Sequence, residues 1–162
     1  MKAELRERGF AKYTPWSRLP RMTIRGWNDS WQAMFEGLGR MKASWPTRGW
    51  SWDPRLLCCT SSFTTEQEPA ARTATAIALP TEWTATTIAR APQQLRDVVE
   101  RAGGVRQGQL VLSNGPLNGL LIYGLWWPWG DAETVSLRVG LADVDPNREP
   151  SLKFRDVFGV TF

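Results

Sequence analysis

The clearest pattern along the chain is a helical one just after residue 92. Apolar residues recur there at intervals of three and four: Leu95, Val98, Val99 and Ala102. Such spacing places them on one stripe of an α-helix. Pro92 suits the first turn of that helix, where a missing N–H costs nothing, and Gly103-Gly104 supplies its end. The pattern predicts a helix with one face packed in a core.

Strand patterns surround this helix. We expect strands at 83–89, 109–113, 117–127 and 135–141, and a final one carried by Leu152, Phe154, Phe158, Val160 and Phe162. Apolar and polar residues alternate along 135–141, which is the period of a half-buried strand. Residues 81–162 are therefore predicted to form an α+β module, with a small antiparallel β-meander of about five strands and one packed helix.

The first half of the chain contains one further helical stripe. Its apolar members are Trp31, Met34, Phe35, Leu38 and Met41, extended upstream by Ile24 and Trp27. Asp29 or Ser30 can cap the helix, which is predicted near 29–41. Residues 45–52 have no period and are expected to form a loop or to be disordered. The stripe is consistent with a core helix, with a helix on an anionic membrane surface, and with a helix docked on the C-terminal module or on a partner.

The composition between residues 60 and 80 is small and polar, which is typical of a linker. We therefore expect three parts: a basic, Trp-rich and partly disordered region at 1–59, a linker at 60–80 and the α+β module at 81–162. An extension that is foreign to the natural chain would produce the same abrupt change in patterning, and is the alternative explanation.

Composition excludes several kinds of chemistry. The chain has 162 residues with ten Trp and no His, so it contains no His-based nucleophile pair, zinc site or pH switch. Charge is unevenly distributed. Residues 1–80 hold 12 Lys and Arg against 7 Asp and Glu, whereas residues 81–162 hold 8 against 9. The basic character therefore belongs to the first half.

The two cysteines are adjacent, at Cys58 and Cys59, and neighbouring residues do not form an ordinary disulfide with each other. This usage favours a reducing, cytoplasmic setting. The first residues lack the apolar run of a secretory signal, and no segment is long and apolar enough for a membrane span. We expect no cofactor. The two thiols are not expected to be reactive, because Arg55 is the one basic residue near them in the sequence.

Basic and aromatic residues are mixed throughout residues 1–55. Basic side chains neutralise phosphates and aromatic rings stack on unpaired bases, so single-stranded nucleic acid is one candidate partner. The residues that would contact it are Arg18, Arg21, Arg25, Trp27, Arg40, Lys42 and Arg48. The alternative is a core helix followed by a solvated basic segment.

A second aromatic cluster ends a predicted strand, at Trp126, Trp127 and Trp129, followed by Asp131 and Glu133. Three rings there could form a wall for a sugar, a base or a Pro-rich peptide. Because Trp126 and Trp127 alternate, they should face opposite sides, and at least one should belong to the core.

Two weaker candidates involve carboxylates. Oxygen-bearing side chains at alternate positions could hold calcium: Asp143, Asp145, Asn147 and Glu149. This loop lacks the Gly and Glu of an EF-hand, and a polar turn is the simpler interpretation. An enzyme without His would depend on Asp131, Glu133 or Asp156 for proton transfer.

The sequence as a whole favours a non-enzymatic binding module. We expect a protein partner or self-association, through the sheet and an aromatic edge at Trp126, Trp127, Trp129 and Asp131. Nucleic-acid binding through the N-terminal region is the first alternative, and a His-free enzyme is the second.

Overall fold

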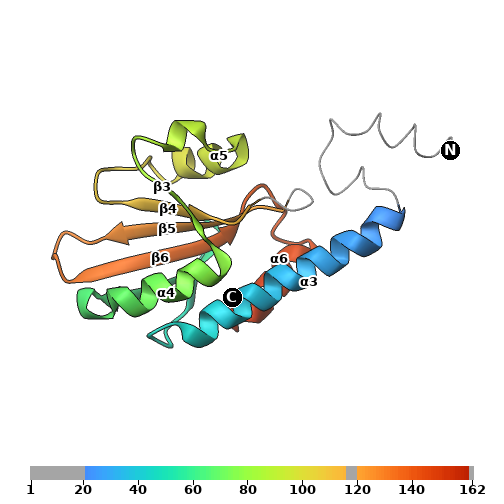
Figure 1. The fold of residues 1–162 in the computed structure, drawn as a ribbon, viewed down its shortest axis with the longest axis horizontal. Coiled ribbons are helices and arrows are strands. Elements are labelled where there is room, and N and C mark those ends of the chain that lie inside the picture. Colours follow the sequence, from blue (N-terminus) through green and yellow to red (C-terminus); the bar gives the residue numbers. More distant parts are fainter. Residues whose placement is uncertain (1–20, 116–119, 161–162) are drawn as a thin grey trace.

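The computed structural model describes residues 21–115 and 120–160, with residues 21–30 described by their backbone alone. An antiparallel sheet of six strands lies at its centre, in the order β1-β2-β6-β5-β4-β3. Helices lie on both sides of this sheet (Figure 1). The predicted α+β class is confirmed, and the strand count is six where about five were expected.

The elements follow a simple chain order. They are α3 (Arg21–Ser44), β1 (Ser51–Asp53), β2 (Cys58–Thr64), η1 (Thr65–Gln67), α4 (Glu68–Ala78), β3 (Thr81–Trp83), η2 (Ile88–Arg90), α5 (Gln93–Arg101), β4 (Leu110–Ser113), β5 (Ile122–Pro128), β6 (Thr134–Leu141) and α6 (Glu149–Phe158).

Strands from both halves of the chain share the sheet. β2 pairs with β6 from Cys59 opposite Val139 to Thr64 opposite Thr134, and β6 pairs with β5 on its other side. Residues 60–80, where a linker was expected, instead contain most of β2 together with η1 and α4. The first half of the chain therefore supplies two of the six strands.

The composition of 60–80 explains why regular structure forms there. Thr is β-branched and favours extended backbone when a neighbouring strand pairs with it, and Phe63 anchors β2 in the core. Alanine has the highest helix propensity, and Pro69 begins α4 where its missing N–H is not needed. Ala71 and Ala74 are fully buried, and their small side chains let α4 pack closely against the rest of the core.

The Trp31 stripe packs on one face of the sheet. Trp31, Phe35, Leu38 and Met41 of α3 join a core with residues of α4, α6 and the strands. α3, α4 and α6 lie together on this side in Figure 1. The predicted helix is confirmed but longer than 29–41, and its stripe is docked on the sheet.

α5 covers the opposite face. Its Leu95, Val98 and Val99 are buried in a second core with Tyr123 and Leu125 of β5. This predicted helix is confirmed, and Gly103 and Gly104 after it have positive φ angles of 98° and 88°.

Three expectations about individual elements are wrong. The final strand is instead the helix α6, because its buried residues recur at helical spacing and Gly159 ends it with a φ of 65°. The strand expected at 83–89 stops at Trp83, and residues 88–90 form η2. The stretch 45–52, expected to lack regular structure, includes the start of the edge strand β1.

Candidate functional site

The aromatic residues predicted as a binding edge lie around the end of β5. Trp126 is 2% exposed and belongs to the core on the α3 side. Its ring lies 4.9 Å from the ring of Phe63, and the Arg72 guanidinium lies over it at 5.5 Å from the ring centre. Trp126 is therefore a buried core residue whose ring makes a cation–π contact with Arg72.

The other two rings have different surroundings. Trp127 is partly buried and packs against the core on the α5 side, as strand alternation predicted. Trp129 follows β5 in the turn to β6 and is 52% exposed. Because Trp126 and Trp127 lie on opposite faces, the three rings do not form one wall, and Trp129 is the ring most available to a partner.

Asp131 holds the turn that carries Trp129. Its carboxylate accepts hydrogen bonds from the N–H of Glu133 and the N–H of Thr134, both at 2.9 Å, and from the Thr134 hydroxyl at 2.8 Å. These bonds, first that from Glu133, lower the pKa of Asp131. The Trp129 N–H also donates to the Thr134 carbonyl at 2.8 Å. The turn is thus ordered by its own side chain.

A cavity of about 1000 Å³ lies beside this end of β5. We call it the hairpin groove. It is bounded by the start of α4, the turn 84–86, the loop 106–110, Trp126 and Pro128. Leu110 and Pro128 offer apolar surface to the groove, whereas Trp126 lies buried beneath the Arg72 guanidinium. Neutral hydrogen-bonding side chains from the turn and the loop complete the lining.

Charges at the groove are largely balanced. A salt bridge of 2.7 Å joins the Arg72 guanidinium to the Glu82 carboxylate, and both side chains are partly exposed. Glu68 and Arg106, of opposite sign, also line the groove. Such a surface favours an uncharged ligand over a strongly charged one.

Sequence reasoning missed most of the residues that line the groove. Arg72, the turn 84–86 and the loop 106–110 are far apart in the chain, and they meet because β3 pairs with β4 and β4 with β5. No local motif marks such a site, because its residues are gathered by sheet order.

The residues proposed to contact nucleic acid are only partly gathered by the fold. Arg18 lies outside the described residues. Arg21, Arg25 and Trp27 belong to the first turns of α3, which extend beyond the sheet in Figure 1. Arg40 and Arg48 are exposed, whereas the Lys42 ammonium donates to the Val157 carbonyl at 3.2 Å. Lys42, Arg48 and Trp50 line a shallow hollow of about 560 Å³.

The candidate calcium loop forms a turn ahead of α6. Asp145 accepts a hydrogen bond from the backbone N–H of Asn147 at 2.8 Å, and its carbonyl accepts one from the Ser151 hydroxyl at 2.8 Å. Asp143 and Glu149 are exposed. Within 21–115 and 120–160, no group of three or more acidic or cysteine side chains is arranged to hold a metal ion.

The adjacent cysteines are fully buried and lie on opposite faces of the sheet, Cys59 on the α3 side and Cys58 on the α5 side. Burial, aided by the negative charge of Asp53, raises the pKa of Cys58 to about 12. Burial likewise raises the pKa of Cys59 to about 12. Both thiols are protonated at neutral pH and are poor nucleophiles.

The carboxylates considered for catalysis do not share a cavity. Asp131 and Glu133 are exposed in the hairpin turn, and Asp156 is exposed on α6. Asp131 is already occupied by three hydrogen bonds from its own turn. Nothing in this arrangement holds a substrate against two acidic groups.

Among the helices that the structure describes, none combines the length and apolar character needed to cross a bilayer. Comparison with known proteins gives no match to a family model, to a curated protein or to a solved structure.

Proposed function

We propose that the protein is a binding module that holds an extended, uncharged segment of a protein partner in the hairpin groove. The observation that carries this proposal is the exposed Trp129 on a turn ordered by Asp131, directly after Pro128, which lines the groove. An aromatic side chain on an ordered turn has few torsion angles to restrict on binding and offers a large contact area.

The chemistry of the groove supports an extended peptide as its occupant. Proline rings and aliphatic side chains pack well on apolar surface such as that of Leu110 and Pro128. The Gln107 amide and the NH2 group of Gln109 can pair with peptide C=O and N–H groups, whereas the Gln109 oxygen already accepts from the Arg106 N–H and the Thr84 and Thr86 hydroxyls bond each other at 3.0 Å. A proline-containing segment fits both features, because it stays extended without internal hydrogen bonds.

The test is selection from a displayed library of short peptides on the immobilised full chain, followed by affinity measurement with the selected peptides. Trp129→Ala should weaken binding by about tenfold or more, as is typical for an aromatic anchor. The matched control is Leu152→Ala on α6, because Leu152 is also 52% exposed. Failure to select any peptide, or equal affinity for the Trp129→Ala chain, would contradict the proposal.

A second candidate is single-stranded nucleic-acid binding by the basic region, supported by the hollow that Lys42, Arg48 and Trp50 line. Its test is retention on single-stranded DNA at low salt and release at moderate salt. Arg40→Gln with Arg48→Gln should weaken retention, whereas Arg90→Gln on η2 should not. No retention at about 50 mM salt would exclude this candidate.

A further inference from the structure

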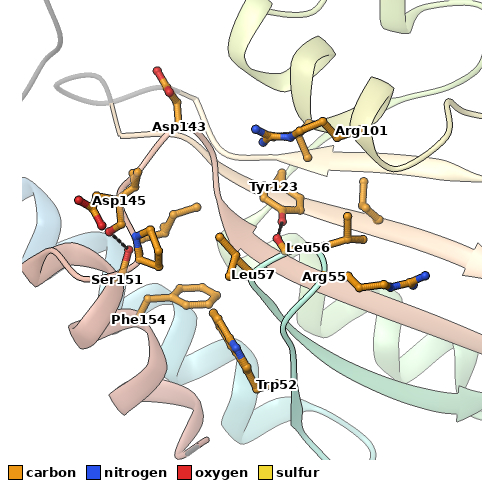
Figure 2. A pocket seen from close by; sticks show the side chains of 15 residues that line it. Trp52, Arg55, Leu56, Leu57, Arg101, Tyr123, Asp143, Asp145, Ser151 and Phe154 are labelled. Atoms are coloured by element: carbon orange, nitrogen blue, oxygen red, sulfur yellow. Dashed lines mark hydrogen bonds between the residues drawn. The ribbon is translucent and has the colours of Figure 1, made fainter. Parts of the chain in front are cut away.

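A second cavity, of about 420 Å³, lies at the other end of the sheet from the hairpin. It is enclosed by the β1–β2 turn, the loop that follows β6, the last turn of α5 and the first turns of α6 (Figure 2). This volume is within the range of small-molecule sites, and four separate elements contribute to the walls. The hairpin groove shares no residue with it.

Aromatic rings form part of its wall. Trp52 and Phe154 lie next to each other in Figure 2. The Arg155 guanidinium lies 4.7 Å from the centre of the Trp52 ring and donates to the Pro146 carbonyl at 2.8 Å, which holds this wall together. The Tyr123 hydroxyl donates to the Leu56 carbonyl at 3.2 Å and is therefore already engaged. This part of the wall thus suits an apolar or aromatic group, with most of the contact offered by the half-buried Trp52 ring.

Charged side chains of both signs line the cavity, Arg55 and Arg101 against Asp143 and Asp145. Arg55 is already paired with the Asp53 carboxylate, at 3.9 Å. Asp143 and Asp145 lie on one side of the cavity in Figure 2, and the Arg101 guanidinium is directed towards that side from the end of α5. Within the described part of the chain, neither Arg101 nor Asp143 takes part in an ion pair. Asp143 is exposed, so its side chain changes rotamer readily and can turn to the opening.

The backbone at the rim is also unusual. Leu57 and Asp143 have φ angles of 54° and 56°, and they are two of the three non-glycine residues with positive φ in the described chain. A leucine in this conformation costs free energy, and it leaves the side chain 44% exposed at the rim. Such conformations concentrate at binding sites, where surrounding structure imposes them.

We propose that this cavity binds a small zwitterion with an apolar side chain, of the class of free hydrophobic or aromatic amino acids. Arg101 would bind the carboxylate, and Asp143 the ammonium group, with Asp145 adding negative charge beside it. The apolar side chain would lie against Trp52 and Phe154. An anion alone would be repelled by the two carboxylates, and a cation alone would leave the Arg101 guanidinium uncompensated.

The first experiment titrates the full chain with each standard amino acid at millimolar concentration and follows the melting temperature, with calorimetry for any that bind. We expect binding by one or more apolar or aromatic amino acids. For the tightest of these, the corresponding amine without the carboxylate and the corresponding acid without the amino group should each bind at least tenfold more weakly. Absence of binding by every amino acid would overturn the proposal.

Variants then locate the site. Arg101→Gln and Asp143→Asn should each weaken binding by about tenfold, and Arg90→Gln, an exposed arginine away from the cavity, should leave it unchanged. The unliganded melting temperatures of the variants should match that of the parent chain, because Arg101 and Asp143 are exposed. Binding that survives both substitutions, or an acid analogue that binds as tightly as its amino acid, would contradict a zwitterion site. Neither result bears on the hairpin groove.

Discussion

The indole nitrogen of Trp45 donates a buried hydrogen bond to the hydroxyl oxygen of Ser61, at 3.0 Å. This bond joins the residue that follows α3 to the middle of β2, and the Trp45 ring also lies edge-on to Phe63 at 5.2 Å. One of the six tryptophans in the basic half of the chain is thus a structural residue of the core.

Trp45→Phe should therefore lower the free energy of unfolding by about 1–3 kcal/mol, because it removes a buried hydrogen bond and some packing. Ser61→Ala should cause a loss of the same order, since it leaves the buried indole N–H without its partner. Urea unfolding of the two single variants and of the double variant measures the coupling. Losses that simply add would show that the two side chains do not interact.

Gly140 of β6 lies opposite Tyr123 of β5, and no side chain fits between them. A Cβ on Gly140 would lie 2.6 Å from Cζ and 2.7 Å from Cε2 of the Tyr123 ring. Gly140→Ala should cost about 1–3 kcal/mol of stability as an overpacked substitution, and Tyr123→Leu in the same chain should recover part of it.

Gly39→Ala is the matched control for this prediction. Gly39 lies within α3, and a Cβ there would have nothing within 4 Å. The alanine should raise stability by up to about 1 kcal/mol, because glycine is a poor helix former. Thermal unfolding of both variants checks the pair, and a harmless Gly140→Ala would mean that the Tyr123 ring is free to move.

The buried thiols predict a loss of stability in alkali. The pKa of Cys58 and that of Cys59 rise from 9.0 to about 12 on folding, so above pH 9 the unfolded chain loses protons that the folded chain retains. The free energy of unfolding that the protonated thiols contribute is fully present below pH 9. It falls as the pH rises from 9 towards 12, by up to about 1.4 kcal/mol per pH unit for each thiol. Burial also raises the pKa of Tyr123, which adds to the decline.

Urea unfolding across that alkaline range measures the effect. The double variant Cys58→Ala, Cys59→Ala should show a shallower decline than the parent chain. The same slope in both chains would mean that the thiols do not cause it. Folded protein at neutral pH should also react slowly with thiol reagents and quickly in urea.

The hydrogen-bonded carboxylate of Asp131 should make the stability of the folded chain depend on pH in the acid range. Its pKa is lowered by hydrogen bonds from Glu133 and Thr134, so its stabilisation is present above the ordinary value of 3.8 and is lost as pH falls through the lowered pKa. Asp131→Ala should lower the melting temperature at neutral pH, and the two chains should converge in acid. Glu133→Ala is the control, because the hydrogen bonds of Glu133 in this turn use its backbone. If the melting temperatures of the parent chain and Asp131→Ala still differ in strong acid, the ionised carboxylate is not what stabilises the turn.

Patterns that depend on neighbours in the chain predicted much of this fold. The apolar stripes of α3 and α5 predict helices, because three- and four-residue spacing identifies a helix whatever it packs against. α6 carried the same signal, since Ser151, Phe154, Arg155 and Phe158 are buried at helical spacing. The apolar residues Leu152, Phe154, Phe158, Val160 and Phe162 predict a strand instead, although Asp156 breaks their alternation.

Features that depend on distant contacts were not predictable in the same way. Ser61 is polar and is nevertheless buried, because Trp45 supplies its hydrogen bond from sixteen residues away. Composition alone therefore made β2 resemble a linker. The candidate site also combines local and distant features. Strand alternation predicts that Trp126 and Trp127 lie on opposite faces of the sheet. Arg72 and the loop 106–110 reach the groove only through the order of the strands, which no local pattern predicts.

The most direct test of the proposed binding function is amide chemical-shift mapping of the full chain with a selected proline-containing peptide. We predict that the shifted amides cluster at residues 84–86, 106–110, Trp126, Trp127 and Trp129, and that Trp129→Ala needs about ten times more peptide to reach the same shifts. Shifts that cluster around Lys42, Arg48 and Trp50, or that spread without a cluster, would contradict it.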